Sequence, residues 1–198
     1  MKATWKIVES VINQYYSLGF KRNKVLFTEF LPKGYTKVTL DTVLPAYWQD
    51  LINIKILLGI FITLYDDFVD NPNYVNPKLI NELVKLPLTS PTIDKSNLTE
   101  FELTVLAFAE NIFTQIIAFL RSLPNFILLK PLFYFDVEQF FNGLKYAQLI
   151  RHVPLMANEV EYLCYLPHNM GIIIAGMMDL MAVAYLDMKE LGLMREFF

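Results

Sequence analysis

The sequence is poor in the residues on which several common functional sites depend. It has one cysteine, Cys164, and two histidines, His152 and His168, among 198 residues. An internal disulfide and a cysteine zinc cluster are therefore excluded, and a histidine metal site has few ligands to draw on. Seven glycines and few alternating apolar and polar residues argue against a sheet protein.

The chain also has fewer basic than acidic residues. The chain has 17 lysines and arginines against 20 aspartates and glutamates, for a formal net charge of -3. No strong basic field is available for phosphate backbones, so we expect no binding to nucleic acid. The sequence contains no nucleophile elbow, phosphate-binding loop, dinucleotide fingerprint or paired His-Glu zinc motif, so hydrolytic, nucleotide-dependent and redox functions lack support.

Apolar residues, in contrast, are abundant. They make up 55% of the chain and charged residues 19%, where about 45–50% and 25% are usual. The longest apolar runs are interrupted by charged side chains: 51–65 by Lys55, 127–135 by Lys130 and 171–186 by Asp179. None reaches the roughly 18–20 residues of a spanning helix, so we expect a chain that does not cross a membrane. Its N-terminus lacks the features of a signal peptide, which predicts a cytoplasmic location.

The apolar spacing predicts helices nearly throughout. The expected helices are 5–18, 47–70, 78–86, 99–123, 131–150 and 156–196, the last with a break at 166–171. Thr99 and Glu102 form a potential capping box at the start of one of them. Residues 38–42 are the one candidate for an extended piece. The pattern indicates a single all-α domain over 1–198, a bundle of six to eight helices.

Three acidic residues, Asp66, Asp67 and Asp70, end the apolar helix predicted over 47–70. At about 100° per residue, Asp66 and Asp70 lie about 40° apart on the helix surface, with Asp67 on the flank. Like charges four residues apart repel, and the C-terminal end of a helix favours cations rather than anions. Bound Mg²⁺, which prefers oxygen ligands, would compensate this charge. The alternative is a solvated acidic helix end.

The helix face below these acids is small and apolar. Ile62 and Thr63 lie one turn before the acids, and Gly59 lies two turns before them. A metal-diphosphate site above a pocket for a hydrocarbon chain needs this layout, so we interpret Ile62, Thr63 and Gly59 as candidate substrate-binding residues.

Residues 66–70, Asp-Asp-Phe-Val-Asp, match the DDxxD motif of class I terpenoid synthases. Residues 150–181 resemble a second segment of that family, which runs from a turn through Glu161-Tyr162-Leu163 to a broken helix at Gly171. The resemblance implies an all-α bundle of the isoprenoid-synthase type, and Mg²⁺ bound by Asp66, Asp67 and Asp70. It also implies that Met170 and Gly171 present carbonyl groups to the substrate, with Asn169 beside them.

The function that this resemblance implies is terpene cyclisation. Asp66 and Asp67 would be the catalytic residues, and Mg²⁺ (about two or three ions in the complete site) would hold a linear prenyl diphosphate in the C15 to C25 range. The resulting cation would cyclise in an apolar, aromatic pocket. Two alternatives stay open: a prenyltransferase of the same fold, and a non-catalytic helical protein that associates, as a homodimer or with a partner, through exposed apolar helices.

The sequence departs from the family pattern in two ways. The arginine expected four or five residues before the helix-break glycine is replaced by Leu166 and Pro167, which leaves Arg151 and Lys145 as candidate diphosphate donors. The second metal motif would lie beyond residue 198, so we expect the chain to be the N-terminal two-thirds of such a domain, and inactive or weakly active alone. The basic cluster at 19–24 is interpreted as a solvated turn.

Overall fold

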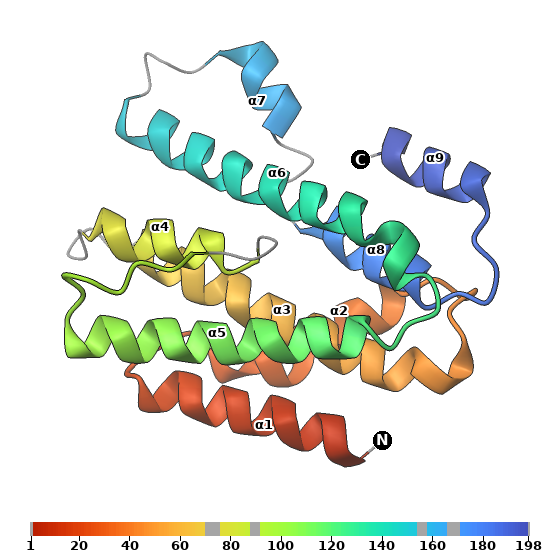
Figure 1. Ribbon diagram of the computed structural model, residues 1–198, viewed down its shortest axis with the longest axis horizontal. Helices are drawn as coiled ribbons and strands as arrows, with labels where there is room; N and C mark the ends of the chain where they lie inside the picture. Colours follow the sequence, from red (N-terminus) through yellow and green to blue (C-terminus); the bar gives the residue numbers. More distant parts are fainter. Residues whose placement is uncertain (1, 70–75, 88–91, 154–157, 166–170, 198) are drawn as a thin grey trace.

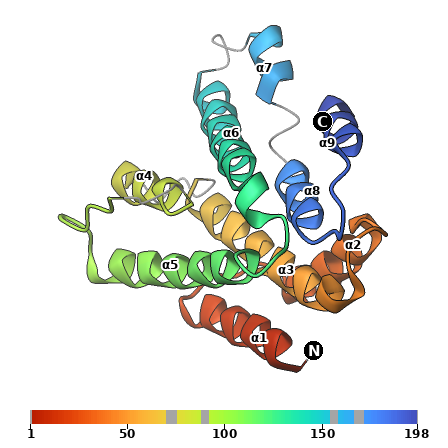
Figure 2. The ribbon, with the colours of Figure 1, turned by 45° about the vertical axis from the view of Figure 1, so that its right-hand side comes forward.

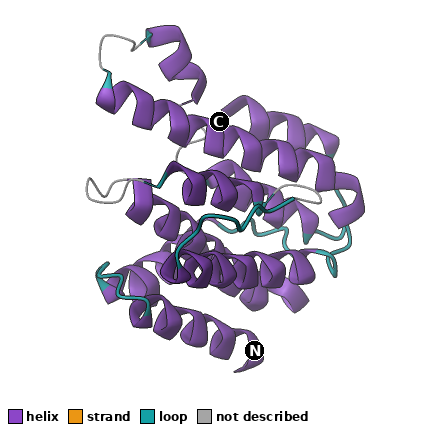
Figure 3. Cartoon of the chain, turned by 60° about the vertical axis from the view of Figure 1, so that its left-hand side comes forward, coloured by secondary structure: helices purple, strands orange, loops and turns teal. Residues whose placement is uncertain are grey.

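The computed structural model describes residues 2–69, 76–87, 92–153, 158–165 and 171–197. Within these ranges every regular element is a helix, so the prediction of an all-α fold is confirmed (Figure 3). In chain order the elements are α1 (Lys2–Ser17), the π-helix η1 (Leu26–Phe30), α2 (Leu31–Val38), α3 (Pro45–Val69), α4 (Pro77–Lys85), α5 (Glu100–Leu120), α6 (Phe126–His152), α7 (Glu159–Tyr165), α8 (Ile172–Met181) and α9 (Met188–Phe197) (Figure 1).

Helix starts follow local sequence signals. At α5 the Thr99 side chain accepts a hydrogen bond from the backbone of Glu102, and the Glu102 carboxylate accepts one from the backbone of Thr99. This reciprocal capping satisfies two backbone donors that the helix cannot pair itself, as the sequence predicted. At α4 the Asn76 side chain accepts from the backbone N–H of Lys78, and Pro77 takes the first turn, where its missing N–H has no cost.

Helix α3 forms the centre of the bundle. It packs against α1, α2, α4, α5 and α8, and every residue from 51 to 61 is buried. A helix surrounded on all sides needs no polar stripe, which explains its largely apolar sequence, with Asn53 and Lys55 as the buried exceptions between 51 and 61. Helix α6 packs against α7 and α8 (Figure 2). One hydrophobic cluster runs through the core, with members from α1 to α9.

The described residues form nine α-helices and one π-helix, more than the six to eight helices expected, because η1 and α2 form before α3 and the C-terminal stretch divides. Three further sequence predictions were wrong in detail. Helix α6 begins at Phe126 rather than at residue 131, and Pro131 lies inside it. The proline is tolerated because its side of the helix is exposed, where the carbonyl group that it leaves unpaired can bind water. Residues 38–42 form no strand, because they comprise the last residue of α2 and the turn that follows it. In the described ranges the one isolated β-bridge joins the next residue, Val43, to Val183.

The third error concerns the C-terminal stretch, which the sequence predicted as one helix after residue 171. The structure divides it into α8 and α9. The Asn125 side chain donates hydrogen bonds to the carbonyls of Leu180 and Val183, and the backbone N–H of Leu44 donates to the carbonyl of Ala182. These bonds come from residues distant in sequence, so periodicity could not reveal the break.

One ion pair lies inside the core, between α3 and α8. The Lys55 ammonium is 2.5 Å from the Asp179 carboxylate, and both side chains are essentially inaccessible to solvent. Lys55 also donates to the Thr39 hydroxyl at 2.9 Å, and the backbone N–H of Leu40 donates to Asp179 at 3.3 Å. This group of residues joins α3, α8 and the end of α2.

Helix α5 is the one helix, in the part of the chain that the structure describes, with the length and apolar composition to cross a membrane. Half of its most apolar 18-residue window is buried inside the structure, chiefly against α3. Glu110 and Asn111 interrupt the apolar sequence of this helix, which is not among the three longest apolar runs named above.

Candidate functional site

The acidic cluster lies at the C-terminal end of the central helix α3. Asp66 and Asp67 are both half-buried in its last turn, whereas Asp70 lies outside the described residues. The two carboxylates point in different directions, because successive residues on a helix are about 100° apart.

Asp67 faces the N-terminal part of the chain. The Tyr15 hydroxyl of α1 donates a hydrogen bond to one carboxylate oxygen, and Arg22 Nε donates to the other at 2.6 Å. Burial and the hydrogen bond to Asp67 raise the pKa of Tyr15. Burial acts to lower the pKa of Arg22, but the bond and charge of Asp67 outweigh it and raise that pKa. Both groups therefore stay protonated and serve Asp67 as donors.

Sequence reasoning missed these two partners. Residues 19–24 are almost all exposed, as expected of a solvated turn, but Arg22 also forms an ion pair with Asp67 that the sequence did not predict. A signal was available: an acidic helix end needs compensating cations, and this is the compact basic cluster of the sequence.

Two predicted site residues, Ile62 and Gly171, lie close together on the other side of α3. Gly171, the N-cap of α8, has a left-handed backbone with φ of +64°. A Cβ atom at Gly171 would lie 3.1 Å from Cδ1 of Ile62 and 3.9 Å from the ring of Phe140. Ile62 precedes Asp66 by one helical turn, so Gly171 lies on the face that leads to Asp66.

Helix α8 runs antiparallel to α3 along this face. Its C-terminal half pairs with α3 through Asp179 and Lys55, and its N-cap Gly171 contacts Ile62, seven residues further along α3. The N-terminal end of α8 therefore points toward the turn that carries Asp66. The positive end of a helix dipole and its unpaired N–H groups stabilise anions, whether a carboxylate or a bound phosphate group.

Gly59 and Thr63 do not lie at this contact. A Cβ atom at Gly59 would come 2.6 Å from Leu31 and 3.3 Å from the Tyr35 hydroxyl, both in α2. The Thr63 hydroxyl donates to the Gly59 carbonyl at 2.8 Å. Gly59 thus allows α2 to approach α3 closely, and the prediction that it shares a pocket with Ile62 is not supported by this geometry.

Aromatic side chains fill the space between α3 and α6. Ring centroids are 6.1 Å apart for Phe61 and Phe141, 5.2 Å for Tyr65 and Phe141, and 5.2 Å for Phe140 and Phe141. The Tyr65 hydroxyl is buried and has no hydrogen-bond partner among the described residues. Burial, with a smaller contribution from the charge of Asp66, raises the pKa of Tyr65 to about 12.

The remaining site predictions cannot be compared with the fold. Asp70, Asn169 and Met170 lie outside the described residues, as does the side chain of Arg151. Lys145 is described, and it lines a cavity between α4 and α6 together with Glu138.

Carboxylate oxygens are the donor chemistry that Mg²⁺ prefers, and Asp66 supplies them. In the described ranges, however, no group of three or more acidic, histidine or cysteine side chains is close enough to hold a metal ion. Asp67 already accepts from Tyr15 and Arg22. A complete site would thus need Asp70 or ligand oxygens in addition to Asp66.

Comparisons with protein-family models, with curated proteins and with solved structures found no match.

Replacing Gly171 with alanine is expected to lower the free energy of unfolding by about 1–2 kcal/mol, because a left-handed backbone is unfavourable for residues with a Cβ atom. The close approach of Ile62 adds to this loss. Gly34→Ala is the matched control, since no atom lies within 4 Å of its Cβ position in α2. Urea denaturation measures both, and a control as damaging as Gly171→Ala would contradict the prediction.

Asp67→Ala is expected to destabilise the fold by about 1–3 kcal/mol, because the Tyr15 hydroxyl loses its acceptor and Tyr15 is inaccessible to solvent. Arg22→Gln should reduce stability by less than about 1 kcal/mol, since a part-exposed ion pair contributes little. Chemical denaturation of the two variants provides the comparison. Equal losses would show that the ion pair, rather than the buried hydroxyl, dominates.

Proposed function

We propose that this chain binds a linear prenyl diphosphate with Mg²⁺ at the carboxylate end of α3 and belongs to the class I terpene cyclases. The observation that carries the proposal is the contact between Ile62 and Gly171 one turn below Asp66. The motif at residues 66–70 and the helix break at Gly171 are distant in sequence, and a shared site requires them to be neighbours.

The proposal gives each side chain a role. Asp66, together with Asp70, would hold the metal ion. The N-terminal end of α8 would favour the negatively charged diphosphate. Mg²⁺, when bound, supplies positive charge that stabilises the leaving diphosphate. Ile62 would exclude water, and the ring of Phe140, which lies beside Gly171, would present an aromatic face to an allylic cation.

Asp67 has a different role in this proposal from Asp66. Because its oxygens accept hydrogen bonds from Tyr15 and Arg22, Asp67 anchors α1 and the segment that follows it to the end of α3. It would position the metal-binding turn from behind, and direct metal binding by Asp67 would require Arg22 to move away.

A second candidate, chain elongation by a prenyltransferase of the same fold, is favoured by one observation. The basic cluster upstream of the acidic motif packs against it through Arg22, and prenyl-elongating enzymes also carry a basic element upstream of their first acidic motif. Consumption of isopentenyl diphosphate together with an allylic diphosphate would identify this activity, because a cyclase uses the allylic substrate alone.

The decisive experiment is calorimetric titration of the chain with farnesyl diphosphate, with Mg²⁺ and with EDTA, and with farnesol plus Mg²⁺ as a control. We expect saturable binding only when both diphosphate and Mg²⁺ are present. Incubation with C10, C15, C20 and C25 diphosphates, followed by mass spectrometry of extracted products, then reports turnover. Absence of Mg²⁺-dependent binding would overturn the proposal and favour a non-catalytic helical protein.

A further inference from the structure

A second candidate binding site lies between α4 and α6. It is a cavity of about 540 Å³. Its lining comes from two helical faces, and none of its residues belongs to the acidic motif: Pro77, Lys78, Asn81, Glu82, Val84 and Lys85 from α4, and Glu138, Phe141, Asn142 and Lys145 from α6. The residues recur three or four positions apart on each helix, so each face is continuous along the cavity.

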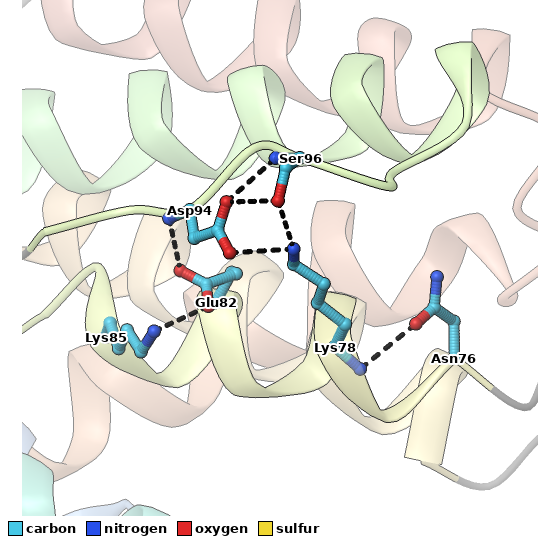
Figure 4. A network of polar contacts seen from close by, with 6 residues as sticks. All are labelled: Asn76, Lys78, Glu82, Lys85, Asp94 and Ser96. Atoms are coloured by element: carbon cyan, nitrogen blue, oxygen red, sulfur yellow. Dashed lines mark hydrogen bonds and ion pairs between the residues drawn. The ribbon is translucent and has the colours of Figure 1, made fainter.

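The carboxylates on the α4 side are already occupied (Figure 4). Glu82 is 3% exposed, and its two oxygens accept from Lys85 Nζ at 2.5 Å and from the backbone N–H of Asp94 at 2.9 Å. Asp94 in turn accepts from Lys78 Nζ at 2.8 Å and from the backbone and hydroxyl of Ser96. These bonds hold residues 94–96 against α4 and use the acceptors of both acids.

Hydrogen-bond donors, in contrast, remain available. Lys145, Asn142 and Asn81 make no hydrogen bond or ion pair with any residue in the described ranges, and Lys85 makes its one bond to Glu82. Three ammonium groups and two carboxylates line the cavity. Glu82 accepts two hydrogen bonds, whereas Glu138 accepts none from the residues that the structure describes. The side chains of the cavity that can still bond to a ligand are therefore mostly hydrogen-bond donors, and Lys145 among them carries a positive charge.

The cavity also has an apolar wall. Val84 and Phe141 are 8% and 4% exposed and line it. The Phe141 ring is held from behind by Tyr65 and Phe61 of α3, so its position is set by the core. A flat or short apolar group could pack here while a charged group reaches the lysines.

We propose that this cavity binds a small organic anion, a carboxylate or a phosphate ester attached to a compact apolar group. Lys145 and Asn142 would donate to the anion, with Lys85 on the opposite helix. Phe141 and Val84 would contact the apolar part, and Glu138 would accept from a hydroxyl or amine group of the same ligand. This inference does not depend on the proposed terpenoid chemistry.

Ligand-observed NMR and calorimetry with phenyl phosphate, benzoate and benzyl alcohol test the inference on the intact chain. We expect one or both anions to bind and the uncharged alcohol to bind at least about tenfold more weakly, since a charge-assisted hydrogen bond is lost. Preference for phenyl phosphate would identify a phosphate ligand, and preference for benzoate a carboxylate. Absence of binding by both anions, or equal binding of the alcohol, would overturn the inference.

Two variants link the binding to this cavity. Lys145→Gln and Asn142→Asp should each weaken anion binding by about tenfold, the first by removing a donor and charge and the second by adding repulsion. Lys37→Gln is the matched control, because Lys37 is exposed in α2 and does not line the cavity. Circular dichroism verifies folding. Equal anion affinity in Lys145→Gln, Lys37→Gln and the unchanged chain would exclude the cavity as the site.

Discussion

Replacement of Asp179 by alanine is expected to lower the free energy of unfolding by about 3–5 kcal/mol. The substitution leaves the Lys55 ammonium in the core with the Thr39 hydroxyl as its remaining described partner. An unpaired buried charge is far less stable than a paired one, because burial in the core removes the stabilisation that water gives to a charge and no opposite charge compensates for it. Equilibrium denaturation in urea, followed by circular dichroism, measures the loss.

The double variant Lys55→Met/Asp179→Leu separates the value of the pair from the penalty of breaking it. Burial lowers the pKa of Lys55 and raises that of Asp179, despite their mutual attraction. The core thus disfavours each charged form, and removal of both charges should restore most of the stability that Asp179→Ala loses. A double variant as unstable as Asp179→Ala would contradict this account and assign the loss to packing.

Asp66→Asn is expected to abolish Mg²⁺-dependent binding of a prenyl diphosphate, with an affinity loss of at least about 100-fold, and to abolish any turnover. The amide keeps the size of the side chain but removes the negative charge that would bind the metal ion. The fold should be retained, since Asp66 is half-buried at the end of α3. Calorimetric titration with farnesyl diphosphate and Mg²⁺ measures the effect.

Asp41→Asn is the matched control for this prediction, because Asp41 is an exposed aspartate in the turn after α2, distant in sequence from the acidic motif. It should bind the ligand as the unchanged chain does. Unaltered binding by Asp66→Asn would remove Asp66 from the metal site, even if the chain proved to bind diphosphates elsewhere.

The acidic site illustrates what sequence reasoning could reach. The spacing of Asp66 and Ile62 on one helix was predictable, because local periodicity determines which residues share a helix face. The proximity of Gly171 was expected from the family resemblance alone, and the fold brings it to Ile62. The partners of Asp67 were not predicted, since Tyr15 and Arg22 reach it only through the packing of α1 and the following segment on α3.

The cavity between α4 and α6 was beyond sequence reasoning for a similar reason. Lys145 was recognised as a candidate anion donor, but its neighbours on α4 depend on the angle between two helices. That angle follows from how each helix packs in the bundle, and it is not a property of either segment alone.

The sequence by itself determined the all-α class, the apolar character of α3 and the start of α5, because these depend on the residue types and on interactions between residues a few positions apart. Only the tertiary structure decided that Asp179 neutralises Lys55, that the chain breaks between α8 and α9, and that Arg22 faces Asp67. Each of these requires charged or polar groups distant in sequence to meet, and their meeting depends on burial and hydrogen bonding in the assembled core.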